Sequence, residues 1–275
     1  EEIPIIKAKR ALRRLPRRFF HYERSSLMEN QKILMEICCG SVDDVIKAEA
    51  GGAHRAELNS DLFHGGLTPS IGTLRMAKKV THIPIMAMVR PRQGGFCYTE
   101  MEFETMLEDA RLLLENGADG IVFGCLQEDG RIDAARCRKL LEAIGDKESV
   151  FHRAIDVTPD WKEALDTLIE LGVTRVLTSG QAPSVLYGME TVRDMVAYAA
   201  GRIEILPGAG IRPGNVRQIL SGTGCSQFHC SASGIAYDRS TENSRGIFFG
   251  GALYPPEDRY STTDLAAVEA YQGVL

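Results

Sequence analysis

The feature that most constrains the fold is a repeated alternation of short apolar runs with amphipathic segments, from Ile33 to the end of the chain. We count eight such strand–helix units, joined by short turns rich in glycine, with no shift of composition that marks a domain boundary. An open doubly wound sheet usually has fewer units, whereas eight parallel strands close on themselves. The sequence therefore predicts an α/β fold, a (β/α)8 TIM barrel, over residues 33–275.

The limits of the units follow from periodicity and from turn residues. The expected strands are 33–38, 54–58, 84–89, 120–123, 150–153, 175–178, 202–206 and 227–230. The expected helices are 42–50, 69–80, 99–116, 134–144, 161–171, 184–200, 213–220 and 263–271, with N-caps at Ser41, Thr68 and Asp133. A polar loop over 231–262 is expected before the last helix.

The first 32 residues stand apart from this alternation. They carry a basic run from Lys7 to Arg18 without an apolar core, which argues against a secretory signal. We expect residues 1–32 to be a basic N-terminal extension, disordered or not native, with Met28 or Met35 as the natural start. The acidic net charge of −5 gives no sign of a nucleic-acid partner, and no apolar run is long enough to span a membrane. Seven cysteines without a CxxC pair fit a reducing, cytoplasmic setting.

Two acidic residues interrupt successive apolar strands near the start of the barrel. Glu36 lies within ILMEIC and Glu57 within HRAEL. A carboxylate in an apolar strand is costly unless it faces a polar cavity or a partner, so we expect both carboxylates to look into one pocket.

Alternate residues of a barrel strand point inward, and active sites lie at the C-terminal ends of the strands. Applying this alternation to five strands predicts a ring of inward polar side chains with a cysteine near the mouth: Glu36, Glu57, Arg90, His152, His229 and Cys38. Such a set suits proton transfer or anion binding. The alternative is a buried ion pair that only specifies packing, for example between Glu57 and Arg90. Similarly, Arg153 and Asp156 either rim the pocket or clip a loop.

Three turns after the last strands are rich in glycine and serine. Small residues there let backbone amides approach an anion, and many barrels bind phosphate after strands seven and eight. The candidate anion-binding residues are Ser179, Gly180, Gly208, Gly210 and Ser231. The simpler alternative is that these glycines only permit tight turns.

For metals, the sequence has no HExxH and no paired CxxC motif. Cys38 and Cys39 are adjacent in a strand and cannot both face the pocket. Cys38 is therefore the one candidate thiolate for a soft ion such as Cu(I), with a sulfur or imidazole from elsewhere completing the site.

Motifs along the whole barrel region resemble the CutC family of copper-homeostasis proteins. They are Leu34-Met35-Glu36-Ile37-Cys38, Gly51-Gly52-Ala53, Glu57-Leu58, Gly65-Gly66-Leu67-Thr68-Pro69-Ser70, Val89-Arg90-Pro91-Arg92, Asp119-Gly120-Ile121-Val122-Phe123-Gly124, Phe151-His152-Arg153-Ala154, Leu177-Thr178-Ser179-Gly180 and Phe228-His229-Cys230-Ser231. The resemblance implies a (β/α)8 barrel, a cytoplasmic location, a homo-oligomer (dimer or tetramer) and a role in copper handling. It also implies copper ligation by two cysteines. Cys38 occupies the first of these positions, and Asn59, a poor Cu(I) ligand, occupies the second.

Two functional hypotheses follow. The first is a cytoplasmic copper-homeostasis protein of the CutC type that binds Cu(I) weakly through Cys38. The second is an enzyme acting on a small anionic or phosphorylated metabolite. In that enzyme Glu36 or Glu57 would be the base, His152 or His229 the acid and Arg90 the charge anchor.

Overall fold

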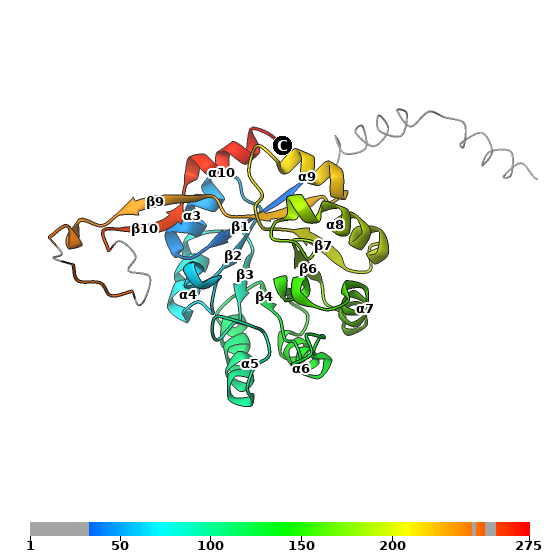
Figure 1. The fold of residues 1–275 in the computed structure, drawn as a ribbon. Coiled ribbons are helices and arrows are strands. Elements are labelled where there is room, and N and C mark those ends of the chain that lie inside the picture. The colour runs from blue at the N-terminus through cyan, green and yellow to red at the C-terminus, as the bar shows by residue number, and fades with distance from the viewer. Residues whose placement is uncertain (1–32, 244–245, 251–256) are drawn as a thin grey trace, which may run out of the picture. The chain divides into compact units, whose positions relative to one another are not determined.

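The computed structural model describes residues 33–243, 246–250 and 257–275, and its centre is a parallel barrel (Figure 1). The eight strands are hydrogen-bonded in the order β7-β6-β5-β4-β3-β2-β1-β8, and β7 lies beside β8, so the ends of this order meet. The strands are β1 (Leu34–Cys39), β2 (Arg55–Leu58), β3 (Ile85–Met88), β4 (Gly120–Phe123), β5 (Glu148–Phe151), β6 (Arg175–Thr178), β7 (Glu204–Pro207) and β8 (Gln227–Cys230). The predicted (β/α)8 barrel is confirmed.

Helices follow the strands and cover the outside of the barrel (Figure 1). They are α3 (Val42–Ala50), α4 (Ile71–Val80), α5 (Glu100–Glu115), α6 (Ala134–Ile144), α7 (Trp161–Leu171), α8 (Val185–Ala199), α9 (Val216–Thr223) and α10 (Leu265–Gln272). The predicted caps Ser41 and Asp133 are confirmed, because each side chain accepts a hydrogen bond from the first turn of its helix. Thr99, expected as the first residue of its helix, is the N-cap of α5.

The predicted cap at Thr68 is wrong. Helix α4 begins two residues later than expected, and the Ser70 hydroxyl accepts from the Thr73 amide at 3.1 Å. Thr68 instead bonds the backbone of Arg90, where its hydroxyl accepts from the amide and donates to the carbonyl. Thr68 is held by the backbone of Arg90 just after β3, and Ser70 on the other side of Pro69 caps the helix instead.

The barrel interior is apolar in its middle layer. One buried cluster contains Met86, Met88, Val122, Val150, Leu177 and Leu206. Met88 of β3 and Val150 of β5 were expected to point inward, and both lie in this buried cluster. Each lies two residues before a predicted site residue, Arg90 and His152 respectively. Polar residues lie at both ends of this layer, and the bottom is closed by Arg175, which pairs with Glu148 and Glu204 at 2.9 and 2.7 Å.

The expected loop over 231–262 is wrong in part, because it contains a two-stranded antiparallel hairpin, β9 (Ser233–Tyr237) and β10 (Arg259–Thr263). The hairpin reaches away from the barrel beside α3 (Figure 1). Its strands pair across about twenty residues of intervening chain, and β10 is mostly polar. The sequence therefore lacks the short turn and the alternating apolar residues that usually predict a hairpin.

Asp44 in α3 joins the start of the barrel to its end. Its carboxylate accepts from the hydroxyl of Thr262 at 2.8 Å and from the amide of Thr263 at 2.5 Å, across 219 positions of sequence. The other oxygen accepts from the Gly40 amide at 3.0 Å. These bonds lower the pKa of Asp44 against the opposing effect of its burial. The segment that leads into α10 is thereby fixed to the first strand–helix unit.

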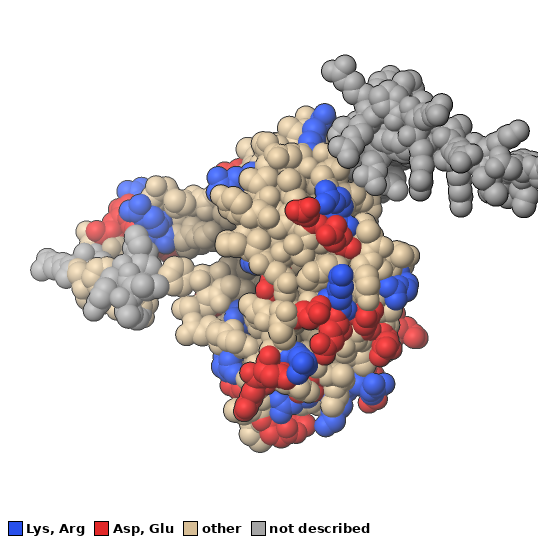
Figure 2. All heavy atoms as spheres, turned by 45° about the vertical axis from the view of Figure 1, so that its right-hand side comes forward, with Lys and Arg blue, Asp and Glu red and all other residues tan. Residues whose placement is uncertain are grey.

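Acidic and basic side chains are interspersed on the face shown in Figure 2, which carries no broad patch of one sign. Within the described residues, none of the helices combines the length and apolarity needed to cross a bilayer. The predicted extension 1–32 lies outside the described residues.

Candidate functional site

The lower part of the site is a buried ionic contact around Glu36. In the strand register Glu36 lies opposite Arg55 of β2 and opposite His229 of β8. Its carboxylate accepts from Arg55 Nε on one oxygen and contacts His229 Nδ1 at 2.7 Å on the other. Burial alone would raise the pKa of Glu36, but the charge of Arg55 and the bond to His229 lower it to about 2. Glu36 is therefore a carboxylate at neutral pH.

The upper part of the site joins Cys38, Glu57, Asn59 and His229. Cys38 lies opposite Glu57 in the register, and its Sγ is 3.6 Å from Glu57 Oε2. The Asn59 side-chain amide donates to the same oxygen at 2.9 Å and lies 3.5 Å from Cys38 Sγ. His229 Nε2 is 3.9 Å from Glu57 Oε2. The two carboxylates thus lie in successive layers and contact opposite nitrogens of one imidazole.

The surroundings of His229 and Cys38 raise the pKa values of both side chains. Burial alone would lower the pKa of His229, but Glu57, Cys38 and Glu36 together raise it well above its usual value. Burial raises the pKa of Cys38 to about 12. At neutral pH the cluster therefore consists of an imidazolium between two acidic side chains and a protonated thiol. It can move a proton at Nε2, or it can release protons when a ligand replaces them.

The contact between Glu36 and Arg55 predicts a stability change in acid. The pKa of Glu36 is lowered from 4.5 to about 2 by folding, so the stabilisation it provides is present above pH 4.5 and is lost as the pH falls toward 2. We expect roughly 3 kcal/mol of unfolding free energy to depend on this group. Urea unfolding of the wild type and of Glu36→Gln across this pH range measures the difference. Parallel pH curves for the two proteins would contradict it.

Arg90 lies at the end of β3 and is buried, with its terminal nitrogens bonded to loops. Nη1 donates to the carbonyls of His64 and Gly66 at 3.1 and 3.0 Å, and Nη2 donates to that of Gly94 at 2.9 Å. Arg90 makes no ion pair with a carboxylate in the described part of the chain. The alternative of a Glu57–Arg90 ion pair is therefore wrong.

His152 follows β5 and caps the short helix η2 (Arg153–Val157). Its Nδ1 accepts from the Ala154 amide at 3.2 Å, which places the proton of the neutral ring on Nε2. Burial and the nearby charge of Arg90 lower the pKa of His152 to about 3. His152 is therefore a neutral hydrogen-bond donor at physiological pH.

The turn after β6 is occupied by a carboxylate of the chain itself. Asp156 accepts from the amide and the hydroxyl of Ser179, from the hydroxyl of Thr178 and from the amide of Gln181. The Gly180 amide donates to Thr178 Oγ1 at 2.9 Å. Arg153 donates to Asp156 at 2.8 Å and also to Ser179. Of the two alternatives for Arg153 and Asp156, the structure shows a loop clip.

The other three candidate anion-binding residues lie in two turns. The Gly208 amide donates to the Thr178 carbonyl at 2.9 Å, and Gly210, with a φ of 78°, packs against Ser184 before α8. Ser231 follows β8 and is exposed. Anion binding at these turns stays a prediction.

Sequence reasoning did not assign a role to Arg55. It lies two residues before Glu57 in the same strand and therefore on the same inward face, one layer deeper, where it meets Glu36. That alternation was a usable signal. The contacts of Asp156 could not be predicted, because they depend on the path of η2 and the sequence has no periodic pattern that indicates this short helix.

One cluster among the described residues has the composition of a metal site. The ligand atoms of Cys38, Glu57 and His229 all lie within 4.8 Å of one another. Glu57 Oε1 is also buried without a hydrogen-bond partner. A thiol, an imidazole and a spare carboxylate oxygen suit Cu(I) or a borderline ion, and the hydrogen bond of His229 Nδ1 to Glu36 directs Nε2 to the cluster.

The chain is similar to named proteins over most of its length. The model of the CutC family matches residues 33–234. A CutC family protein from Treponema denticola is 54% identical over 86% of this chain and 96% of its own, and the human copper homeostasis protein cutC homolog is 41% identical over 88% of each. The crystal structure of the copper homeostasis protein CutC from Streptococcus agalactiae superposes with a TM-score of 0.70 at 35% identity, over 72% of this chain and 98% of that one. The chain belongs to the CutC family.

Proposed function

We propose that the protein acts in copper homeostasis by binding Cu(I) at the barrel mouth. Cys38 and His229 would supply the sulfur and nitrogen donors, and Glu57 would be a third, weaker donor. The observation that carries this proposal is the 4.8 Å cluster of their ligand atoms. The names of the similar proteins agree with it.

The surroundings of the cluster imply modest affinity. Ligation needs the thiolate of Cys38 and a neutral His229, whereas the raised pKa values of both groups keep their protons in place at neutral pH. Asn59 adds a hydrogen-bond donor beside Sγ but no soft ligand. Cu(I) must therefore displace two protons, and its affinity should rise with pH.

The test is an anaerobic Cu(I) titration against a competing chelator. Replacing a residue that only hydrogen-bonds a metal ligand usually lowers metal affinity about 10–100-fold. Replacing the ligand itself, as in Cys38→Ser, should therefore lower Cu(I) affinity at least about tenfold. Cys97→Ser is the matched control, because Cys97 is also a free thiol but is exposed in the loop before α5. Equal affinities for the wild type and Cys38→Ser would refute the proposed site.

Location and assembly complete the proposal. We place the protein in the cytoplasm as a dimer or tetramer, in keeping with the family resemblance and with free cysteines among the described residues. Light scattering after size-exclusion chromatography measures the assembly, and a monomer would contradict that part of the proposal.

A further inference from the structure

Buried polar side-chain atoms without a partner gather on one arc of the barrel mouth. In the described part of the chain these atoms are Glu57 Oε1, Asn59 Oδ1, Arg90 Nε, Tyr98 OH and His152 Nε2. All five residues lie at the ends of β2, β3 and β5 or in the loop after β3. Because buried polar groups are usually hydrogen-bonded, this concentration marks a place built for a ligand.

Two of these atoms, His152 Nε2 and Arg90 Nε, are donors whose side chains lie beside one aromatic ring. The Phe96 ring centroid is 4.8 Å from the ring of His152 and 5.4 Å from Arg90 Cζ. Tyr98 is two residues further along the same loop, and its phenol oxygen interacts with the Arg90 guanidinium rather than with a ligand. His152 Nε2 carries a proton, as its Nδ1 is already an acceptor. The donors beside Phe96 are therefore a neutral imidazole and a guanidinium N–H.

The charge of Arg90 has no counter-charge in the part of the chain that the structure describes. Arg90 is only 8% exposed, and its terminal nitrogens meet three neutral carbonyl oxygens. A buried cation without a carboxylate partner is costly. An anionic ligand would supply that partner through the remaining Nε.

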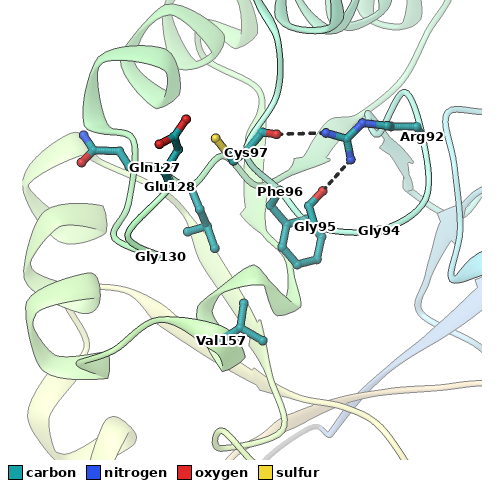
Figure 3. A pocket seen from close by; sticks show the side chains of 10 residues that line it. Arg92, Gly94, Gly95, Phe96, Cys97, Gln127, Glu128, Gly130 and Val157 are labelled. Carbon is teal, nitrogen blue, oxygen red and sulfur yellow. Dashed lines mark hydrogen bonds between the residues drawn. The ribbon is translucent and has the colours of Figure 1, made fainter.

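Phe96 also lines a cavity of about 440 Å³, whose lining does not include Arg90 or His152. Its lining includes Phe96, Leu126 and Val157, together with the backbone of Gly94 and Gly95, and Figure 3 shows the Phe96 ring among these residues. Arg92 also lines it, but its guanidinium is bonded to Glu102 and to the carbonyls of Gly95 and Cys97. The free volume is thus mainly apolar and large enough for a small organic molecule.

We propose that this cavity and the two donors beside Phe96 form one binding site for a small organic carboxylate with an apolar body. The Phe96 side chain turns aside, the carboxylate accepts from His152 Nε2 and Arg90 Nε, and the apolar body fills the space beside Leu126 and Val157. A carboxylate fits better than a phosphate ester. Both terminal nitrogens of Arg90 already donate to carbonyl oxygens, so only Nε remains and the guanidinium cannot bind a phosphate through two nitrogens. The site shares no residue with the proposed copper ligands.

The experiment is titration of the full chain with benzoate as the probe, followed by NMR or calorimetry. Benzyl alcohol has the same ring without the charge, and phenyl phosphate tests the other anion. Benzoate should bind at least about tenfold more tightly than benzyl alcohol, the factor expected for hydrogen bonds to a charged group. Benzyl alcohol binding as tightly as benzoate, phenyl phosphate binding more tightly, or no binding of benzoate would overturn the proposal.

Two substitutions at His152 separate the roles of its nitrogens. His152→Gln keeps a donor near the position of Nε2, whereas His152→Asn keeps only an acceptor near that of Nδ1. Benzoate affinity should stay close to the wild-type value in the first variant and fall about tenfold or more in the second. Equal affinities for the two variants would contradict the proposed donor.

Val157→Asp gives an answer that does not depend on the buried histidine. Val157 lines the cavity with 62% of its surface exposed, so this variant should fold normally. The added carboxylate should weaken benzoate binding and leave benzyl alcohol binding nearly unchanged. Cys38→Ser should bind benzoate like the wild type, which separates this site from the copper site. Unchanged benzoate affinity in Val157→Asp would overturn the proposal.

Discussion

Replacing Glu36 by glutamine should lower the free energy of unfolding at neutral pH by about 3–5 kcal/mol, the cost of leaving one partner of a buried ion pair alone. Arg55 would keep its charge in the barrel interior and would lose its carboxylate partner, leaving neutral amide oxygens such as that of Gln227 at 3.2 Å. His229 would lose the carboxylate that holds its Nδ1 at 2.7 Å. Equilibrium unfolding in urea, followed by circular dichroism, measures the loss.

An exposed glutamate provides the matched control for this substitution. Glu190 pairs with Arg193 at 3.2 Å on the surface of α8, with its side chain 83% exposed. Glu190→Gln should change the unfolding free energy by less than about 1 kcal/mol. In a double variant, Glu36→Gln with Arg55→Met, removing the uncompensated charge should restore part of the loss. A single variant Glu36→Gln as stable as Glu190→Gln would show that the contact does not hold the barrel together.

Adding one methyl group at Gly188 should destabilise the protein by about 3 kcal/mol or more, at the upper end of what overpacking usually costs. A Cβ on Gly188 would lie 1.9 Å from the carbonyl oxygen of Ser179, which belongs to the buried turn after β6. Neither backbone can move without disturbing the bonds of that turn to Asp156. Thermal and urea unfolding of Gly188→Ala measure the effect.

Gly222→Ala is the matched control, because Gly222 also lies within a helix. The Cβ there would meet Met189 Sδ at 3.2 Å, and a methionine side chain can turn aside. Alanine is favoured over glycine in a helix by about 1 kcal/mol, so Gly222→Ala should lie within about 1 kcal/mol of the wild type. Equal stabilities of the two variants would show that the close approach of α8 to the turn is unimportant.

The sequence was sufficient to predict the barrel and the inward face of its strands. The helices 42–50, 134–144 and 161–171 were predicted with the limits that the structure shows, since each has a capping side chain before it and a glycine after it. The hairpin β9–β10 was missed because its two strands are distant in sequence and carry few buried residues. Local patterns thus predicted what local interactions determine.

The candidate site was predicted less completely, for a similar reason. The inward alternation brought Glu36, Glu57, Cys38 and His229 together, as the structure shows. It could not show that the terminal nitrogens of Arg90 would bond loop carbonyls or that Asp156 would fill the turn at Ser179, because both depend on the paths of loops. The assignment of a catalytic acid and base among these residues stays a prediction.

The bonds of Asp44 to Thr262 and Thr263 have a consequence for how the chain folds. They join residues more than 200 positions apart, and they fix the segment that carries α10 beside α3. The contact between β1 and β8 is similarly distant in sequence. Contacts of such high sequence separation form late and slow the search for the native state. During synthesis, the barrel should therefore stay open at the β1–β8 seam until β8 has left the ribosome.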